Sequence, residues 1–179
     1  MPIHQRPDLL EKLATPTNRR YYLAGIPDGT DGIRMTLRIM AKMVRAYKHQ
    51  PLMVELARAI VADVPAKNGA AEVDAIRRWI MEHVRYTSDV NGVESLQTPD
   101  ALLESLQGDC DDQATLMATL AEAIGKSTRF KAVAFAPDQF EHVFPEVRLG
   151  PGWVSAETTE EVELGWKPPN VVSAMIEHV

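Results

Sequence analysis

The feature of this 179-residue chain that most constrains its fold is a change of hydrophobic period near Gly125. Before this glycine, apolar residues recur at the spacing of amphipathic helices. After Lys126 they alternate with polar residues, which predicts strands over 130–135, 142–147 and 153–156. Helices followed by a run of strands favour an α+β domain, with a helical N-terminal half packed on an antiparallel sheet.

Turn-forming residues divide the helical half into segments. Pro51 suits the first turn of one helix, Pro65 ends that helix, and Gly125 ends the last one. We therefore expect helices over residues 33–48, 51–63, 70–86, about 98–108 and about 110–124. Residues 1–32 are rich in Pro and Gly and should form an irregular arm, and residues 87–98 should form a polar loop.

The net charge of −6 is unevenly distributed. Residues 1–50 carry nine Lys/Arg and four Asp/Glu, or +5, and the remaining residues carry ten and twenty-one, or −11. A basic stripe on the first helix contributes much of this positive charge, and its members are Arg34, Arg38, Lys42 and Arg45. The charge imbalance indicates either a basic arm packed on the chain's own acidic body or a docking surface for an acidic protein partner. The stripe itself is commonly a solvated helix face. We accordingly divide the chain into a basic arm and helix, 1–50, and a main domain, 51–179.

The sequence favours a reducing, cytoplasmic location and disfavours membrane and nucleic-acid binding. The N-terminus lacks the apolar stretch of a secretory signal, and no apolar run approaches the roughly 20 residues of a membrane span. One cysteine cannot form an internal disulfide. Basic residues interleaved with aromatic ones, as in nucleic-acid-binding proteins, are not seen.

That cysteine, Cys110, lies where a helix is expected to begin, in the string Gly108-Asp109-Cys110-Asp111-Asp112. A helix N-terminus stabilises a thiolate through its unpaired backbone N–H groups and its macrodipole. Gly108 should let the chain turn tightly into the helix, whereas the three aspartates oppose the anion and call for a nearby cation. Cys110 is therefore either a catalytic nucleophile or a small buried residue, and its acidic neighbours disfavour an apolar pocket.

His142 and Glu157 follow in the order that a nucleophile requires of its partners. His142 begins the second expected strand, where it would share one face with Phe144 and Glu146. Glu157 follows the third strand and could accept a hydrogen bond from the imidazole, fixing its orientation. The alternatives are an ordinary strand histidine and one more acid in an acidic C-terminal region.

Residues about 70–160 resemble the transglutaminase-like superfamily, whose fold is a circularly rearranged relative of the papain-like proteases. The match comprises a nucleophile helix opened by Gly108-Asp109-Cys110, a histidine strand His142-Val143-Phe144-Pro145-Glu146-Val147, and a closing strand from Gly152 to Glu157. The upstream segments from Trp79 to Tyr86 and around Gln97 are similar to small bacterial and phage-encoded members. Two departures are Glu157 in place of the usual Asp, and Pro145, which implies an edge strand or a bulge.

The resemblance implies a cysteine-dependent enzyme that transfers acyl groups from peptide or amide bonds, as a protease, an amidase or a transglutaminase. The implied catalytic triad is Cys110, His142 and Glu157, with a protein or peptide substrate and no cofactor. The backbone N–H of Cys110 should stabilise the oxyanion, together with a side chain upstream. Candidates for that side chain are Tyr86, Gln97 and, less favoured, Trp79.

Two other readings compete with an enzyme. The first is an assembly module that retains the fold and docks into a larger complex, such as a phage particle, through its basic stripe. The second is a metal site formed by Cys110, His142 and the neighbouring aspartates. Zinc prefers several Cys or His ligands, and adjacent residues at a helix start point in different directions, so we expect no metal.

Overall fold

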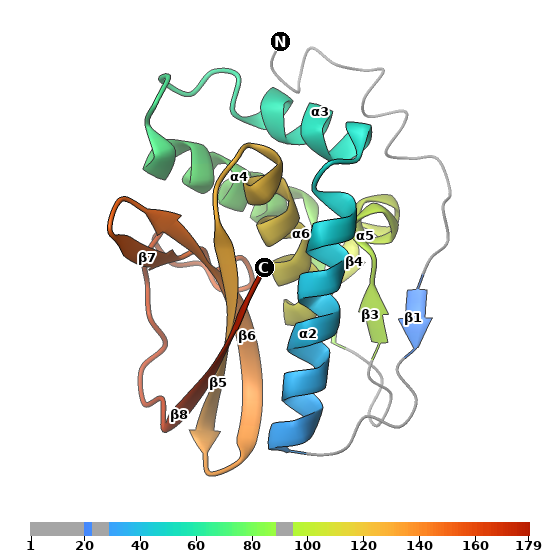
Figure 1. Ribbon diagram of the computed structural model, residues 1–179, viewed down its shortest axis with the longest axis vertical. Coiled ribbons are helices and arrows are strands. Elements are labelled where there is room, and N and C mark those ends of the chain that lie inside the picture. The colour runs from blue at the N-terminus through green and yellow to red at the C-terminus, as the bar shows by residue number, and fades with distance from the viewer. Residues whose placement is uncertain (1–19, 23–28, 89–94) are drawn as a thin grey trace.

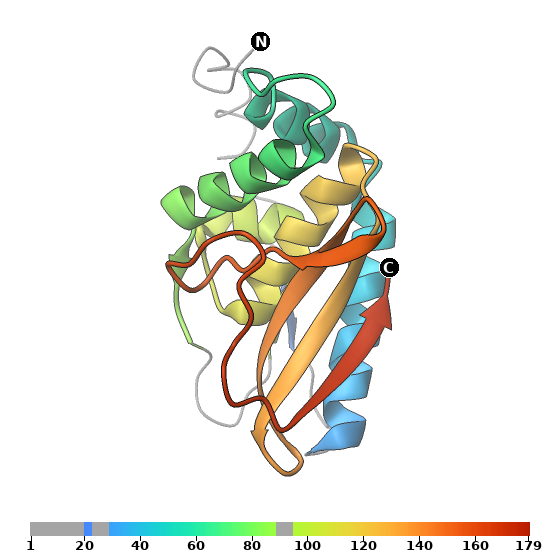
Figure 2. The same ribbon diagram turned by 90° about the vertical axis from the view of Figure 1, so that its left-hand side faces the viewer.

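The computed structural model describes residues 20–22, 29–88 and 95–179. Helices pack against one face of a four-stranded antiparallel sheet (Figures 1 and 2). The helices are α2 (Thr30–Tyr47), α3 (Pro51–Ile60), α4 (Gly69–His83), α5 (Pro99–Ser105) and α6 (Cys110–Ala123). The α+β class predicted from the change of period is confirmed.

The main sheet has the strand order β7-β6-β5-β8, with every neighbouring pair antiparallel. Its strands are β5 (Thr128–Ala136), β6 (Gln139–Leu149), β7 (Gly152–Ser155) and β8 (Ser173–His178). Two short pairs lie outside it. Strand β1 (Arg20–Tyr22) pairs antiparallel with β3 (Ser95–Gln97), and β2 (Arg85–Tyr86) pairs parallel with β4 (Gln107–Gly108).

Several expected boundaries were wrong, and most of the errors lie where a distant segment supplies the hydrogen bonds. Helix α4 ends at His83 because residues 85–86 pair with β4, and the expected loop contains β3 because it pairs with β1. The expected arm contains β1, and α2 already begins at Thr30. Helix α3 ends at Ile60, three residues early, and β8 was missed because this edge strand is half exposed and lacks a clear apolar alternation.

Helix α6 is the centre of the core. It contacts helices α2, α3, α4 and α5 and strands β5 and β6. Its buried Thr115 and Thr119 hydroxyls each donate to the backbone carbonyl four residues earlier, at 2.7 Å, so these polar groups are satisfied inside the helix. Because α6 is enclosed by other elements, its first residue, Cys110, is held in a defined position.

Helix α2 belongs to the same core, since Leu37, Met40 and Val44 are fully buried against α6 and β5. The basic stripe occupies its exposed face. The division of the chain at residue 50 and a partner for this face stay predictions. None of the helices described is long and apolar enough for a membrane crossing.

Candidate active site

Asp109 determines where α6 begins. It is the N-cap residue, with extended backbone angles, and its carboxylate accepts hydrogen bonds from the backbone N–H groups of Asp111 and Asp112, at 3.2 and 3.3 Å. This satisfies donors that the first helical turn would otherwise leave unpaired. The capping confirms the expected position of Cys110 in the first turn.

Gly108 is required by close packing rather than by the tight turn that we expected. A Cβ atom at this position would lie 2.7 Å from Oδ2 of Asp112 and 2.8 Å from Cδ1 of Leu102. The backbone carbonyl of Gly108 accepts a hydrogen bond from the N–H of Thr87, so the chain after β2 continues alongside β4. Glycine therefore lets α6 approach β4 and α5 closely.

Asp112 points toward a buried polar cluster. Its two oxygens accept from the backbone N–H and the side-chain amide of Gln97, at 2.7 and 2.6 Å. The same amide nitrogen donates to the carbonyl of Gln107, and the amide oxygen accepts from Ser105. Because both amide protons of Gln97 are engaged in this cluster, we no longer consider it an oxyanion donor. It anchors the start of α6 instead.

The thiol of Cys110 is held in its protonated form. It donates to Oδ1 of Asp111 at 3.5 Å. Burial raises the pKa of Cys110 well above its ordinary value, and the charges of Asp111 and Asp109 raise it further, although the backbone N–H of Val143 opposes them. Of the three neighbouring aspartates, then, Asp111 and Asp109 oppose the thiolate most, and Asp112 is engaged elsewhere.

The geometry of β6 explains how Val143 reaches Cys110. Strand β7 pairs with residues 146–149 and ends at Ser155, after which the N–H of Ala156 donates to the carbonyl of Pro145. In a strand, the N–H and C=O groups of one residue point toward the same neighbouring strand, and those of the next residue point toward the opposite one. Residues two positions apart therefore point their backbone groups to the same side. Pro145 therefore removes no bond to β5, and the N–H of Val143 faces the region beyond the end of β7. We expected Pro145 on an edge strand or at a bulge. It lies on the inner strand β6, where the pairing of β6 with β7 ends. The register between β5 and β6 is irregular next to His142.

His142 and Glu157 are joined by a short hydrogen bond, with Nε2 of the imidazole 2.6 Å from Oε2 of the carboxylate. Glu157 is only 1% exposed, and its other oxygen accepts from the N–H groups of Thr158 and Thr159 and from the Thr159 hydroxyl. Burial raises the pKa of Glu157, but these hydrogen bonds and the charge of His142 outweigh it and lower the pKa below its usual value. These contacts hold the side chain of Glu157 firmly, although it is longer than the aspartate that is usual at this position.

This bond determines the chemistry open to the imidazole. Glu157 is ionised and can only accept, so Nε2 of His142 carries the proton that it donates. In the neutral ring Nδ1 is then an acceptor, and no residue that the structure describes is hydrogen-bonded to it. His142 can therefore receive a proton at Nδ1 while Glu157 holds the ring.

Of the remaining oxyanion candidates, Tyr86 lies near the thiol, and Trp79 belongs to the buried core. Tyr86 is 51% exposed on β2, and burial and the charge of Cys110 raise its pKa while a hydrogen bond with Ser88 lowers it. Trp79 is buried in the core and stacks on His83, with ring centroids 4.6 Å apart. Tyr86 is thus the candidate side chain that the structure places near Cys110.

Sequence reasoning missed two residues next to the site. Arg77 on α4 is 3% exposed and donates to the carbonyl of Val162 at 2.7 Å, which ties the segment after Glu157 to α4. Gln113, one turn after Cys110, is buried with its Oε1 unpartnered. A glutamine inside a buried helix was a visible signal, but the burial of Arg77 depends on a segment eighty residues away.

Metal binding has no support in the described part of the chain, where no group of three or more His, Cys, Asp or Glu is arranged to hold an ion.

A solved protein structure resembles this chain in fold. A crystal structure from Cytophaga hutchinsonii, provisionally described as a cysteine protease, matches with a TM-score of 0.51 at 21% identity, over 73% of this chain and 47% of that one. One from Parabacteroides distasonis, provisionally described as a protease, has a TM-score of 0.49 at 15% identity, over 74% and 30%, and supports no argument. At these identities the likeness shows the fold alone.

The chain spans about half the length of the Cytophaga protein, and no curated protein matches it. The profile of the transglutaminase-like superfamily matches residues 53–158, which is more than half of the chain and includes Cys110, His142 and Glu157. This chain belongs to the transglutaminase-like superfamily.

Proposed function

We propose that the protein is a cysteine-dependent acyl-transfer enzyme that acts on peptide or amide bonds. Cys110 is the nucleophile, His142 the general base and acid, and Glu157 the residue that orients His142. The observation that carries the proposal is the imidazole held by a buried carboxylate, next to the backbone N–H that reaches the sulfur of Cys110. A nucleophile, a base and an orienting acid in this relation are the parts that such a reaction needs.

In the proposed reaction, Sγ of Cys110 bonds to the substrate carbonyl carbon while its proton moves to Nδ1 of His142. The tetrahedral intermediate collapses as His142 gives this proton to the leaving nitrogen, the C–N bond breaks, and a thioester remains on Cys110. Water then attacks the thioester, His142 takes a proton from it, and the acid is released as this proton returns to the sulfur. An amine in place of water would give a crosslink.

The raised pKa of Cys110 favours proton transfer during the attack over a resting thiolate–imidazolium pair. Glu157 would then stabilise the positive charge that develops on His142. We assign the oxyanion to the backbone N–H of Cys110 at the helix start and to the hydroxyl of Tyr86. We place hydrolysis ahead of crosslinking because the exposed Tyr86 leaves water a route to the thioester.

One observation favours the second candidate, an assembly module without turnover. The thiol of Cys110 donates a hydrogen bond to Asp111, and a thiol that stays protonated in this way would not act as a nucleophile. Such a module would dock through the exposed basic stripe of α2. The assay for acyl transfer separates the two functions, because an assembly module requires no reactive Cys110.

Acylation by p-nitrophenyl acetate tests the proposal, since it needs no knowledge of the natural substrate. We expect one equivalent of p-nitrophenolate in a burst, acetylation of Cys110 by mass spectrometry, and loss of both in Cys110→Ala. Replacing His142 with alanine should slow acylation about 100-fold or more, the usual contribution of a general base. His49→Ala, at an exposed histidine beyond α2, is the matched control. A rate equal to that of a cysteine peptide and unchanged in His142→Ala would sink the proposal.

A further inference from the structure

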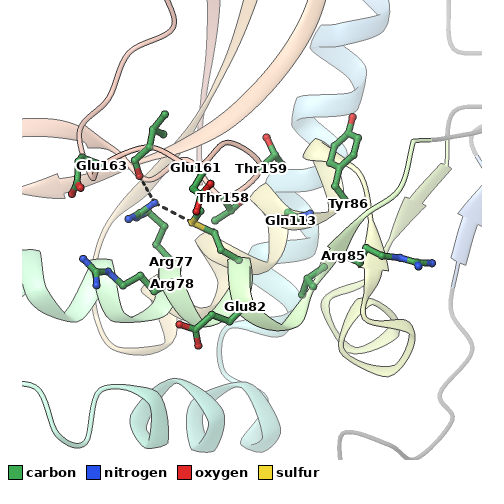
Figure 3. A pocket seen from close by; sticks show the side chains of 13 residues that line it. Arg77, Arg78, Glu82, Arg85, Tyr86, Gln113, Thr158, Thr159, Glu161 and Glu163 are labelled. Carbon is green, nitrogen blue, oxygen red and sulfur yellow. Dashed lines mark hydrogen bonds between the residues drawn. The ribbon is translucent and has the colours of Figure 1, made fainter.

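A cleft of about 690 Å³ opens beside the candidate active site (Figure 3). One wall is formed by the C-terminal half of α4 and by β2, and the other by residues 158–159 and 161–163. At one end it is lined by Tyr86, whose pKa responds to the charge of Cys110, and by Thr159, which holds Glu157. The proposed reaction therefore takes place at the edge of this cleft.

Gln113 gives the cleft a buried hydrogen-bond acceptor. Its side chain is 1% exposed and lines the cleft, and its Oε1 has no partner among the residues described. Nε2 lies 3.4 Å from the carbonyl of Gly108, so reversing the amide would place two oxygens against each other. A buried amide oxygen without a partner is unfavourable, and the backbone N–H of a bound peptide would satisfy it.

The cations around the cleft are already engaged. Arg77 and Arg78 share the carboxylate of Asp74, with one oxygen each at 2.8 Å. Arg85 donates to the side-chain oxygen of Gln107 at 2.9 Å, and Figure 3 shows it pointing away from the segment that carries Glu161. The charges of Arg77 and Arg78 are therefore partly neutralised by Asp74, and the charge of Arg85 points away from the opposite wall of the cleft (Figure 3).

The carboxylates of the cleft are not engaged. Glu161 and Glu163 are exposed on the 158–163 segment, across from Arg77 in Figure 3, and Glu82 lies on α4. Within the described part of the chain, none of these three forms an ion pair. The cleft thus presents uncompensated negative charge next to a buried hydrogen-bond acceptor, which favours a ligand with a cation and an N–H donor.

We propose that this cleft binds the peptide substrate of the acyl transfer, with a substrate N–H on Oε1 of Gln113 and a basic side chain against Glu161 and Glu163. The basic side chain is a specificity contact and is not the amine that attacks the thioester. The proposal rests on the proposed function for its place in catalysis, but the binding step does not require turnover.

Binding to the full chain carrying Cys110→Ala tests the inference. The probes are two blocked alanine pentapeptides with central arginine or central citrulline, which has nearly the same shape without the charge. By NMR titration at low salt, the arginine peptide should bind about fivefold tighter, the gain that an exposed ion pair gives. Glu161→Gln with Glu163→Gln should abolish this preference. The matched control, Glu160→Gln, lies on the same segment outside the cleft and should retain it.

Gln113→Leu provides the second arm, because it should weaken both peptides alike and leave the arginine preference intact. Equal affinities for the two peptides, or a preference that survives loss of both carboxylates, would overturn the inference. Its failure is distinguishable from failure of the proposed function. If the protein prefers the arginine peptide but Cys110 is not acetylated, the peptide-binding cleft stands and the proposed function fails. If Cys110 is acetylated but the two peptides bind equally, the proposed function stands and only the specificity for a basic side chain fails.

Discussion

Replacing Arg77 with methionine should destabilise the protein and slow the acylation of Cys110. Methionine fills a similar volume on α4 but cannot donate hydrogen bonds. The guanidinium donates to the carboxylate of Asp74 at 2.8 Å and to the carbonyl of Val162 at 2.7 Å, and it also approaches the carbonyl of Glu157 at 3.5 Å. The contacts to the two carbonyls join α4 to the segment that begins with Glu157.

The two short bonds set the size of the effect. Hydrogen bonds that involve a charged group contribute roughly 1.5–3 kcal/mol each, so losing both should lower the free energy of unfolding by about 3–6 kcal/mol. Arg78 is the matched control, because it shares the same Asp74 but its side chain is 63% exposed. Arg78→Met should cost less than about 1 kcal/mol, as expected of an exposed ion pair.

The assay combines urea unfolding with the p-nitrophenyl acetate burst, measured where both variants are folded. If Arg77 positions Glu157, then Arg77→Met should slow acylation on the order of 10-fold or more, because small displacements of positioning groups are costly. Arg77→Lys should recover part of the stability and less of the rate, since lysine lacks the planar fork. The reasoning is refuted if Arg77→Met unfolds like Arg78→Met, and its positioning part fails if a folded Arg77→Met acylates at the wild-type rate.

Three further outcomes follow from the site. Gly108→Ala should lower the free energy of unfolding by about 1–3 kcal/mol in urea titrations, because its Cβ would lie 2.7 Å from Asp112; an unchanged midpoint would contradict this. Asp111→Asn should speed the alkylation of Cys110 by iodoacetamide at about pH 8, because it removes a charge that raises the thiol pKa, and a slower rate would argue against it. The pKa of Glu157 is lower in the folded chain than its ordinary value of 4.5, so its ionisation contributes stability above this pH that is lost as pH falls through the folded pKa. The stability gap between wild type and Glu157→Gln should therefore narrow on acidification, and a constant gap down to about pH 3 would count against the assignment.

The sequence by itself determined the features that depend on near neighbours. The change of period at Gly125 predicted helices before a sheet, and the spacing of apolar residues predicted a helix over about 110–124 that begins near Cys110. Both signals are local, since periodicity follows from which side of one element is buried. The order of Cys110, His142 and Glu157 was equally visible along the chain.

Only the tertiary structure decided which side chains are free to act. Gln97 was an oxyanion candidate until Asp112 and Gln107 were seen to engage its amide protons. The pKa of Cys110 depends first on burial, and burial is produced by elements far away in the sequence. Arg77 gave no sign of its role because its partner carbonyl belongs to a segment that folds back onto α4. Hydrogen bonding and desolvation are properties of packed neighbours, so a pattern along the chain predicts where a reactive group lies but not its protonation state.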